Sequence, residues 1–76
     1  MTRHRRTQMI TITLELGVAQ ETLIALRDRA HLLQAEVAAG ASGEPGAAAV
    51  ANIARRQLER VLAVGTVLAA ECGESF

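Results

Sequence analysis

The sequence is poor in aromatic residues, cysteine and proline, and it contains no lysine. One of its 76 residues is aromatic, Phe76, whereas fifteen are alanine and half are hydrophobic. Side chains this small bury little apolar area, and a chain of this length leaves roughly 40% of its unfolded-state surface exposed after folding. We therefore expect the chain to need a partner for stability, and a second copy related by a two-fold axis is the simplest one.

The single cysteine, Cys72, excludes an internal disulfide. Small secreted domains are usually held together by several disulfides, so the cysteine count favours the reducing cytoplasm. A transmembrane helix needs roughly 18 consecutive apolar residues. Arg55, Arg56 and Glu59 interrupt the longest hydrophobic segment. The sequence thus predicts a cytoplasmic protein that makes no contact with a membrane.

The eight basic residues are all arginine, and they are unevenly distributed. Arg3, Arg5 and Arg6 precede the first acidic residue, Glu15, and the rest of the chain holds five arginines against eight carboxylates. This asymmetry predicts a basic flexible arm at residues 1–7 and a single, mildly acidic domain at residues 8–76. Such an arm is either a solvated terminus or an anion-binding extension.

Two lines of small and apolar residues run through the domain at alternating steps of four and three. A mean step of 3.5 residues keeps each line on one face of a helix, where it must pack against another helix. The lines predict helices at 19–39 and 45–71, joined by a loop that reverses the chain, with Gly40 ending the first helix in a left-handed conformation. The residues assigned to the oligomer interface are Leu23, Leu26, Ala30, Leu33, Val37, Ala54, Leu58, Val61, Gly65 and Leu68.

The second helix carries more apolar surface than one contact needs. Five large side chains lie away from its contact line, namely Val50, Ile53, Leu62, Val64 and Val67. Because these side chains spread around the helix, a hairpin of two helices cannot bury all of them. We therefore predict that two hairpins pair into a four-helix bundle, which makes the protein a homodimer.

Residues 8–16 alternate between apolar and polar side chains. Ile10, Ile12 and Leu14 fall on one face, and threonines fall on the other. Alternation with β-branched residues is typical of a half-buried strand, whose backbone donors and acceptors need a pairing partner. We expect this strand to pair through Ile10, Ile12 and Leu14 with its own copy or with a sheet edge of another protein. The predicted fold class is mainly α, with a strand before an antiparallel αα-hairpin.

The sequence contains no recognisable catalytic or metal-binding constellation. His4 lies in the arm, and His31 lies beside the contact line of the first helix, where it is a boundary residue of the packing. Glu21 and Asp28 are two helical turns apart, too far to share a proton. The loop at 43–46 lacks the lysine and hydroxyl side chains of a phosphate-binding loop. The sequence predicts no enzymatic activity, no cofactor and no small-molecule substrate.

The order of elements, a basic arm, an alternating strand and two helices, resembles that of ribbon-helix-helix repressors and antitoxins. The similar residues are Ile10-Thr-Ile-Thr-Leu-Glu-Leu-Gly17, Leu23, Leu26 and Ala30. In that family, paired strands enter the major groove of DNA, and the N-terminus of the second helix holds a phosphate. The resemblance implies DNA contacts at Arg3, Arg5, Arg6, Thr11 and Thr13, with Met9 on the same strand face and residues 42–46 at the phosphate.

Two functions follow from these observations. In the first, the chain is a non-enzymatic, homo-oligomeric module that acts as a regulator, inhibitor or assembly subunit by binding a protein partner. In the alternative, it is a DNA-binding repressor or antitoxin of the ribbon-helix-helix type. We expect the first function, because residues 9–15 contain none of the Arg, Lys, Asn and Gln side chains that make most base-specific contacts.

Overall fold

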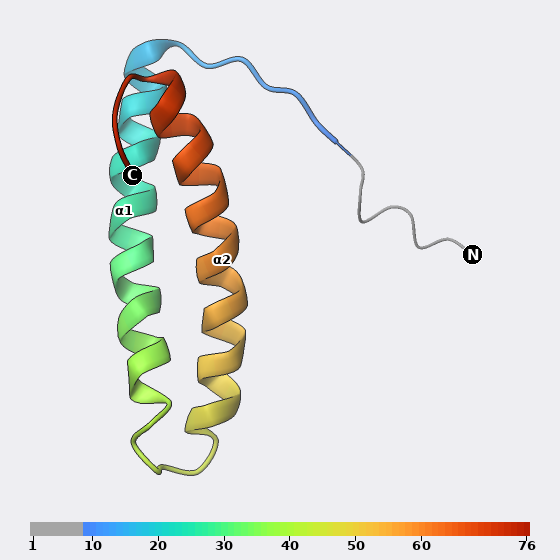
Figure 1. The fold of residues 1–76 in the computed structure, drawn as a ribbon, viewed down its shortest axis with the longest axis vertical. Helices are drawn as coiled ribbons and strands as arrows, with labels where there is room; N and C mark the ends of the chain where they lie inside the picture. Colours follow the sequence, from blue (N-terminus) through green and yellow to red (C-terminus); the bar gives the residue numbers. More distant parts are fainter. Residues whose placement is uncertain (1–8) are drawn as a thin grey trace, which may run out of the picture.

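A computed structural model of the chain describes residues 9–76 and consists mainly of two long helices lying side by side (Figure 1). Helix α1 spans Leu16–Ala39, and helix α2 spans Ala47–Glu71. The loop at 40–46 reverses the chain, so the two helices run antiparallel. The helical hairpin predicted from the sequence is therefore confirmed. The predicted arm at residues 1–7, with Arg3, Arg5 and Arg6, lies outside the described residues.

The core of the hairpin is the contact between α1 and α2. Its largest fully buried side chains are Leu23 and Leu33, and its other buried positions are small: Ala19, Ala30, Ala51, Ala54, Gly65 and Ala69. The distance between two packed helices depends on the side chains at their contact. Small residues therefore let α1 and α2 approach closely, and the core they enclose is one layer of side chains.

Gly40 shows how close this approach is at the loop end of the hairpin. A Cβ atom placed on Gly40 would overlap the Cβ atom of Ala51. The expectation that Gly40 adopts a left-handed conformation is wrong, because its φ is −62°. Gly40 is therefore required for the space it leaves to α2, and the left-handed positions of the loop are Gly43 and Gly46, with φ of 85° and 80°.

The strand predicted at residues 8–16 is not present in its described part. Residues 9–15 belong to no helix or strand and extend away from the end of the hairpin where α1 begins and α2 ends (Figure 1), and Leu16 already lies in α1. A strand requires a second strand for its backbone hydrogen bonds, and the described part of this chain provides none. The first helix consequently begins three residues before the predicted boundary at residue 19, after an extended Glu15 (φ −63°, ψ 151°).

The C-terminal residues turn back after α2 and contact α1 (Figure 1). Gly73 has a φ of 73°, the Glu74 amide donates to the Ala69 carbonyl at 2.8 Å, and the Gly73 amide donates to the Ala70 carbonyl at 3.2 Å. This pair of hydrogen bonds around a left-handed glycine is a Schellman motif, which redirects the chain at the end of a helix. We call residues 73–76 the C-terminal clasp.

The clasp is attached to α1 through Arg27. The Arg27 guanidinium donates to the Ser75 carbonyl at 2.8 Å and forms an ion pair with Glu74 at 3.2 Å. The same guanidinium lies 5.7 Å from the centre of the Phe76 ring, within the range of a cation–π contact. A Cβ atom on Gly65 would overlap this ring. Gly65 therefore provides the space in which the only aromatic side chain of the protein is seated.

Candidate interaction surface

The described residues 9–76 contain no buried polar side chain and no group of three His, Cys, Asp or Glu residues that could hold a metal ion. His31 is exposed on α1. Within these same residues, neither helix has a stretch that is long and apolar enough to cross a bilayer. The chemical character of the described surface comes instead from apolar side chains that are in contact with water.

Thirteen large hydrophobic side chains are exposed: Met9, Ile10, Ile12, Leu14, Leu16, Val18, Ile24, Leu32, Val50, Ile53, Leu62, Val64 and Val67. Single exposed apolar residues are normal on a protein surface. Contiguous apolar patches larger than a few hundred Å² are uncommon on soluble monomers and usually mark an interaction site. Several of these side chains lie together and line a common groove.

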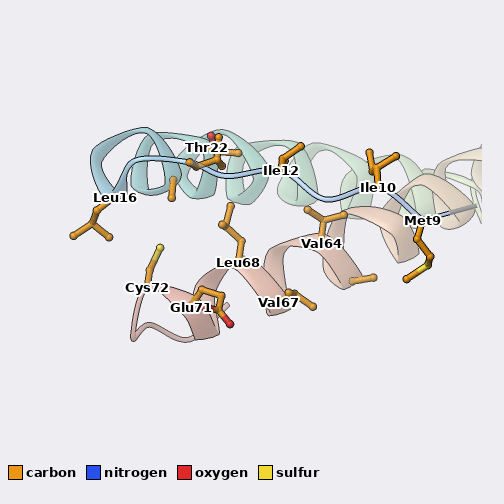
Figure 2. A pocket seen from close by; sticks show the side chains of 13 residues that line it. Met9, Ile10, Ile12, Leu16, Thr22, Val64, Val67, Leu68, Glu71 and Cys72 are labelled. Carbon is orange, nitrogen blue, oxygen red and sulfur yellow. The ribbon is translucent and has the colours of Figure 1, made fainter.

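An apolar groove lies between the segment at residues 9–15 and α2 (Figure 2). We call it the α2 groove, and its volume is about 890 Å³. One wall consists of Met9, Ile10, Ile12 and Leu14, and α1 contributes Leu16, Ala19 and Thr22. The opposite wall belongs to α2 and its end, with Ala63, Val64, Val67, Leu68, Glu71 and Cys72.

The side chains of the N-terminal segment keep the alternation seen in the sequence. Ile10, Ile12 and Leu14, which the sequence assigned to strand pairing, line the α2 groove together. Thr11 and Thr13, which the ribbon-helix-helix resemblance assigned to DNA contacts, are exposed and do not line it. Met9, which the sequence placed on the same face as the threonines, also lines the groove, so the alternation holds from Ile10 to Leu14 only.

The residues assigned by sequence to the oligomer interface lie between α1 and α2 of one chain. Five of them are buried there and the other five are half-buried, namely Leu26, Val37, Leu58, Val61 and Leu68. A contact between chains at these same positions stays a prediction. The side chains available to a second molecule are the exposed ones.

A second line of residues on α2 lies beside the buried one. Its four large apolar side chains were assigned from the sequence to surface away from the contact line, but their common spacing was not recognised. We call this line the outer line of α2, and it consists of Val50, Ile53, Gln57, Arg60, Val64, Val67 and Glu71. Its steps are alternately three and four residues, so these side chains share one face of the helix. The apolar members Val50, Ile53, Val64 and Val67 are 55–66% exposed. The same spacing rule that identified the buried line could have revealed the outer one.

The polar members of the outer line occupy its centre and one end. Gln57 accepts a hydrogen bond from Arg29 of α1 at 3.2 Å, which positions the Gln57 amide at the side of the hairpin. Glu71, the last residue of α2, lines the α2 groove. At its other end, α2 begins at Gly46 with no side-chain cap and with no acidic residue in its first turn. The free amide groups there leave the helix start partially positive.

The exposed apolar side chains of the α2 groove and of the outer line can bind an apolar surface. Comparisons of the chain with protein-family models, curated proteins and solved structures find no match. The function is therefore inferred from the residues themselves.

Proposed function

We propose that this protein is a non-enzymatic interaction module that forms a homodimer and acts by binding a protein partner. The observation that supports this proposal is the outer line of α2, whose four apolar side chains are more than half exposed in the single chain. A lone cysteine is best kept reduced in the cytoplasm, and we propose that the module works there.

The magnitude of the exposed apolar surface favours a dimer over an isolated hairpin. Fully burying a Val or Ile side chain contributes roughly 1.5–3 kcal/mol, so burying the exposed half contributes about 1 kcal/mol. Two copies of the outer line would thus contribute about 8 kcal/mol. Loss of translational and rotational freedom on association costs roughly 4–15 kcal/mol. The outer line alone supports a weak dimer, and a tight one requires further apolar contacts.

Sedimentation equilibrium over a wide concentration range tests the proposal. We expect a monomer–dimer equilibrium in the micromolar range for the wild type. Val64→Glu places a charge on the outer line and should raise the dissociation constant about tenfold or more, because an unpaired charge in an apolar contact is costly. The matched control is Thr66→Glu, an exposed position on the other side of the same helix turn. A folded monomer at every concentration would contradict the proposal.

DNA binding is the second candidate, and it is favoured by the two-sided character of residues 9–15. Thr11 and Thr13 are exposed and do not line the α2 groove, and residues that read bases from a paired ribbon must likewise be accessible. Binding to duplex DNA should then fall steeply as salt is raised, because phosphate contacts release counterions. Replacing Arg3, Arg5 and Arg6 by Gln should abolish it. If low-salt titrations detect no binding, this candidate is wrong.

A further inference from the structure

We infer that a second copy of this chain packs antiparallel along the outer line of α2, so that the first half of the partner's α2 fills the α2 groove. This inference rests on the proposed homodimer and specifies its contact surface, direction and register. The argument comes from the order of residues on the outer line, from the charges at its two ends and from the shape of the groove.

The spacing of the residues on the outer line is the same in both directions along α2. From Val50 to Val67 its steps are three, four, three, four and three residues, so the line matches itself when a second copy is turned end to end. In this register Val50 lies opposite Val67 of the partner subunit, and Ile53 lies opposite Val64 of the partner subunit. A two-fold dimer requires this kind of self-complementary surface, in which each contact occurs twice.

The polar centre of the line selects the antiparallel direction. A parallel pair in register would place Arg60 against its own copy, and like charges at facing positions destabilise a helix pair. The antiparallel pair places Arg60 opposite the Gln57 amide of the other chain. The Gln57 oxygen has a second lone pair beside the one used by Arg29. The Arg60 guanidinium can therefore donate a hydrogen bond to a neutral amide oxygen at the centre of the contact and does not face a second guanidinium directly.

The ends of the line are also complementary in this register. Glu71 lies opposite Gly46 of the partner subunit, where α2 begins. That helix start has no side-chain cap and no acidic residue in its first turn. A carboxylate beside the free amides of a helix N-terminus is stabilising by about 0.3–1 kcal/mol. Each chain thus supplies the negative group that the other chain's helix start lacks.

The α2 groove provides the additional apolar contact that a tight dimer requires. Its α2 wall contains Val64, Val67 and Glu71, which are the second half of the outer line. The pairing therefore brings the first half of the partner's helix into the groove, where Ile10 and Ile12 stand on the opposite wall (Figure 2). These two side chains are 84% and 72% exposed in the single chain, and they would be covered by the incoming helix.

Disulfide trapping between differently substituted chains tests the register directly. In a Cys72→Ser background, chains carrying Ile53→Cys are mixed with chains carrying Val64→Cys and equilibrated in a glutathione redox buffer. We expect a cross-linked heterodimer in the mixture and little cross-linking in either variant alone. The matched control mixes Asn52→Cys chains with Thr66→Cys chains, which have similar positions along α2 but lie on another side of it. No cross-link is expected in the control.

The outcomes separate the inference from the proposed function. If sedimentation detects a dimer but the Ile53→Cys and Val64→Cys chains do not link, the dimer exists and the inferred surface is wrong. If Ile53→Cys chains link efficiently to each other, the helices are parallel and the inferred direction is wrong. If no dimer forms with the wild type, the proposed function and the inference both fail. All variants are first compared with the wild type by circular dichroism, because exposed positions should leave the fold intact.

A second measurement tests the ends of the contact. Glu71→Gln removes the negative charge from two symmetric contacts and should raise the dimer dissociation constant about threefold to thirtyfold. Glu59→Gln, at an exposed position away from the outer line, is the control and should leave the constant unchanged. Equal constants for the Glu71→Gln variant and the wild type would contradict the inferred position of the helix start.

Discussion

Two lines of residues with similar spacing run along α2, and they differ in whether their side chains are buried against α1 or exposed. The inner line, Ala51, Ala54, Leu58, Val61 and Gly65, packs against α1, whereas the outer line holds larger branched side chains that remain exposed. Close approach between two helices selects small residues on the inner side. Three of the five inner positions are Ala or Gly, whereas the four apolar positions of the outer line are all Val or Ile. The proportion of small residues on each line, and not hydrophobicity alone, therefore distinguishes the contact within the chain from the surface left to a partner.

The largest effect in this comparison is expected from a charge placed in the core of the hairpin. Leu33→Asp buries a carboxylate where the side chain has no exposed surface, and an unpaired buried charge costs several kcal/mol. We expect loss of most of the helical circular dichroism signal. Leu32→Asp is the matched control. The Leu32 side chain is 59% exposed, so this variant should keep the fold. If Leu33→Asp and Leu32→Asp lose their helical signal at the same temperature, the assignment of Leu33 to the core and of Leu32 to the surface is wrong.

A larger side chain on the inner line should cause the next largest loss in the free energy of unfolding. Ala54→Leu adds three carbon atoms at a position that is 1% exposed, and overpacking a close contact destabilises by about 1–3 kcal/mol. Ala48→Leu adds the same atoms at an exposed position of α2 away from the outer line and should change the stability by less than about 0.5 kcal/mol. Thermal and urea unfolding of the two variants measure this difference. Equal stabilities would mean that α1 and α2 are not closely packed.

Gly65 lies on the inner line beneath the clasp, so the effect of a methyl group there depends on Phe76. In the wild type, the new Cβ atom of Gly65→Ala displaces the Phe76 ring, and this cost opposes the gain of up to about 1 kcal/mol from replacing glycine by alanine in a helix. In a Phe76→Ala background only the gain remains, so the same change should be more stabilising there. A double-mutant cycle measures this difference. Identical effects in both backgrounds would disprove the contact.

The smallest effect is expected at the ion pair of the clasp. Arg27 and Glu74 are each 36% exposed at their side chains, and exposed ion pairs typically contribute 0.2–1 kcal/mol. Glu74→Gln should therefore lower the free energy of unfolding by less than about 1 kcal/mol, with a smaller loss at high salt. Arg27→Gln should cost more, because it also removes the hydrogen bond to the Ser75 carbonyl. The salt dependence of unfolding provides the measurement, and a salt-independent difference would argue against the ion pair.

The helical part of the fold could be predicted from the sequence because its signal is local and repeated. The steps of three and four residues from Ala19 to Val37 placed the first helix, and its predicted end at residue 39 is confirmed. The second helix begins two residues after its predicted start and ends at Glu71 as predicted. The start of α1 was predicted too late, because the alternation at residues 10–16 was interpreted as a strand continuing through Leu16.

The candidate site could be predicted only in part, because it depends on contacts between distant residues. The apolar side of residues 9–15 was identified from its alternation, but its neighbour, Val64 on α2, follows from how the segment leaves α1. Gly73 was a visible signal for a helix end, since glycine commonly follows the last helical residue. That Phe76 would then reach Gly65 and Arg27 is a tertiary result that no local pattern contains.

The clasp has a consequence for how the hairpin opens. A helical hairpin is joined covalently at its loop, so its other end is the one expected to fray first, and such fraying is measured by amide hydrogen exchange. The clasp ties α2 to Arg27, which lies about three turns inside α1. Amide protons near the end of α2 and in the middle of α1 should therefore exchange with a common opening free energy. Replacing Arg27, which removes its contacts to the clasp, should make the two regions exchange independently.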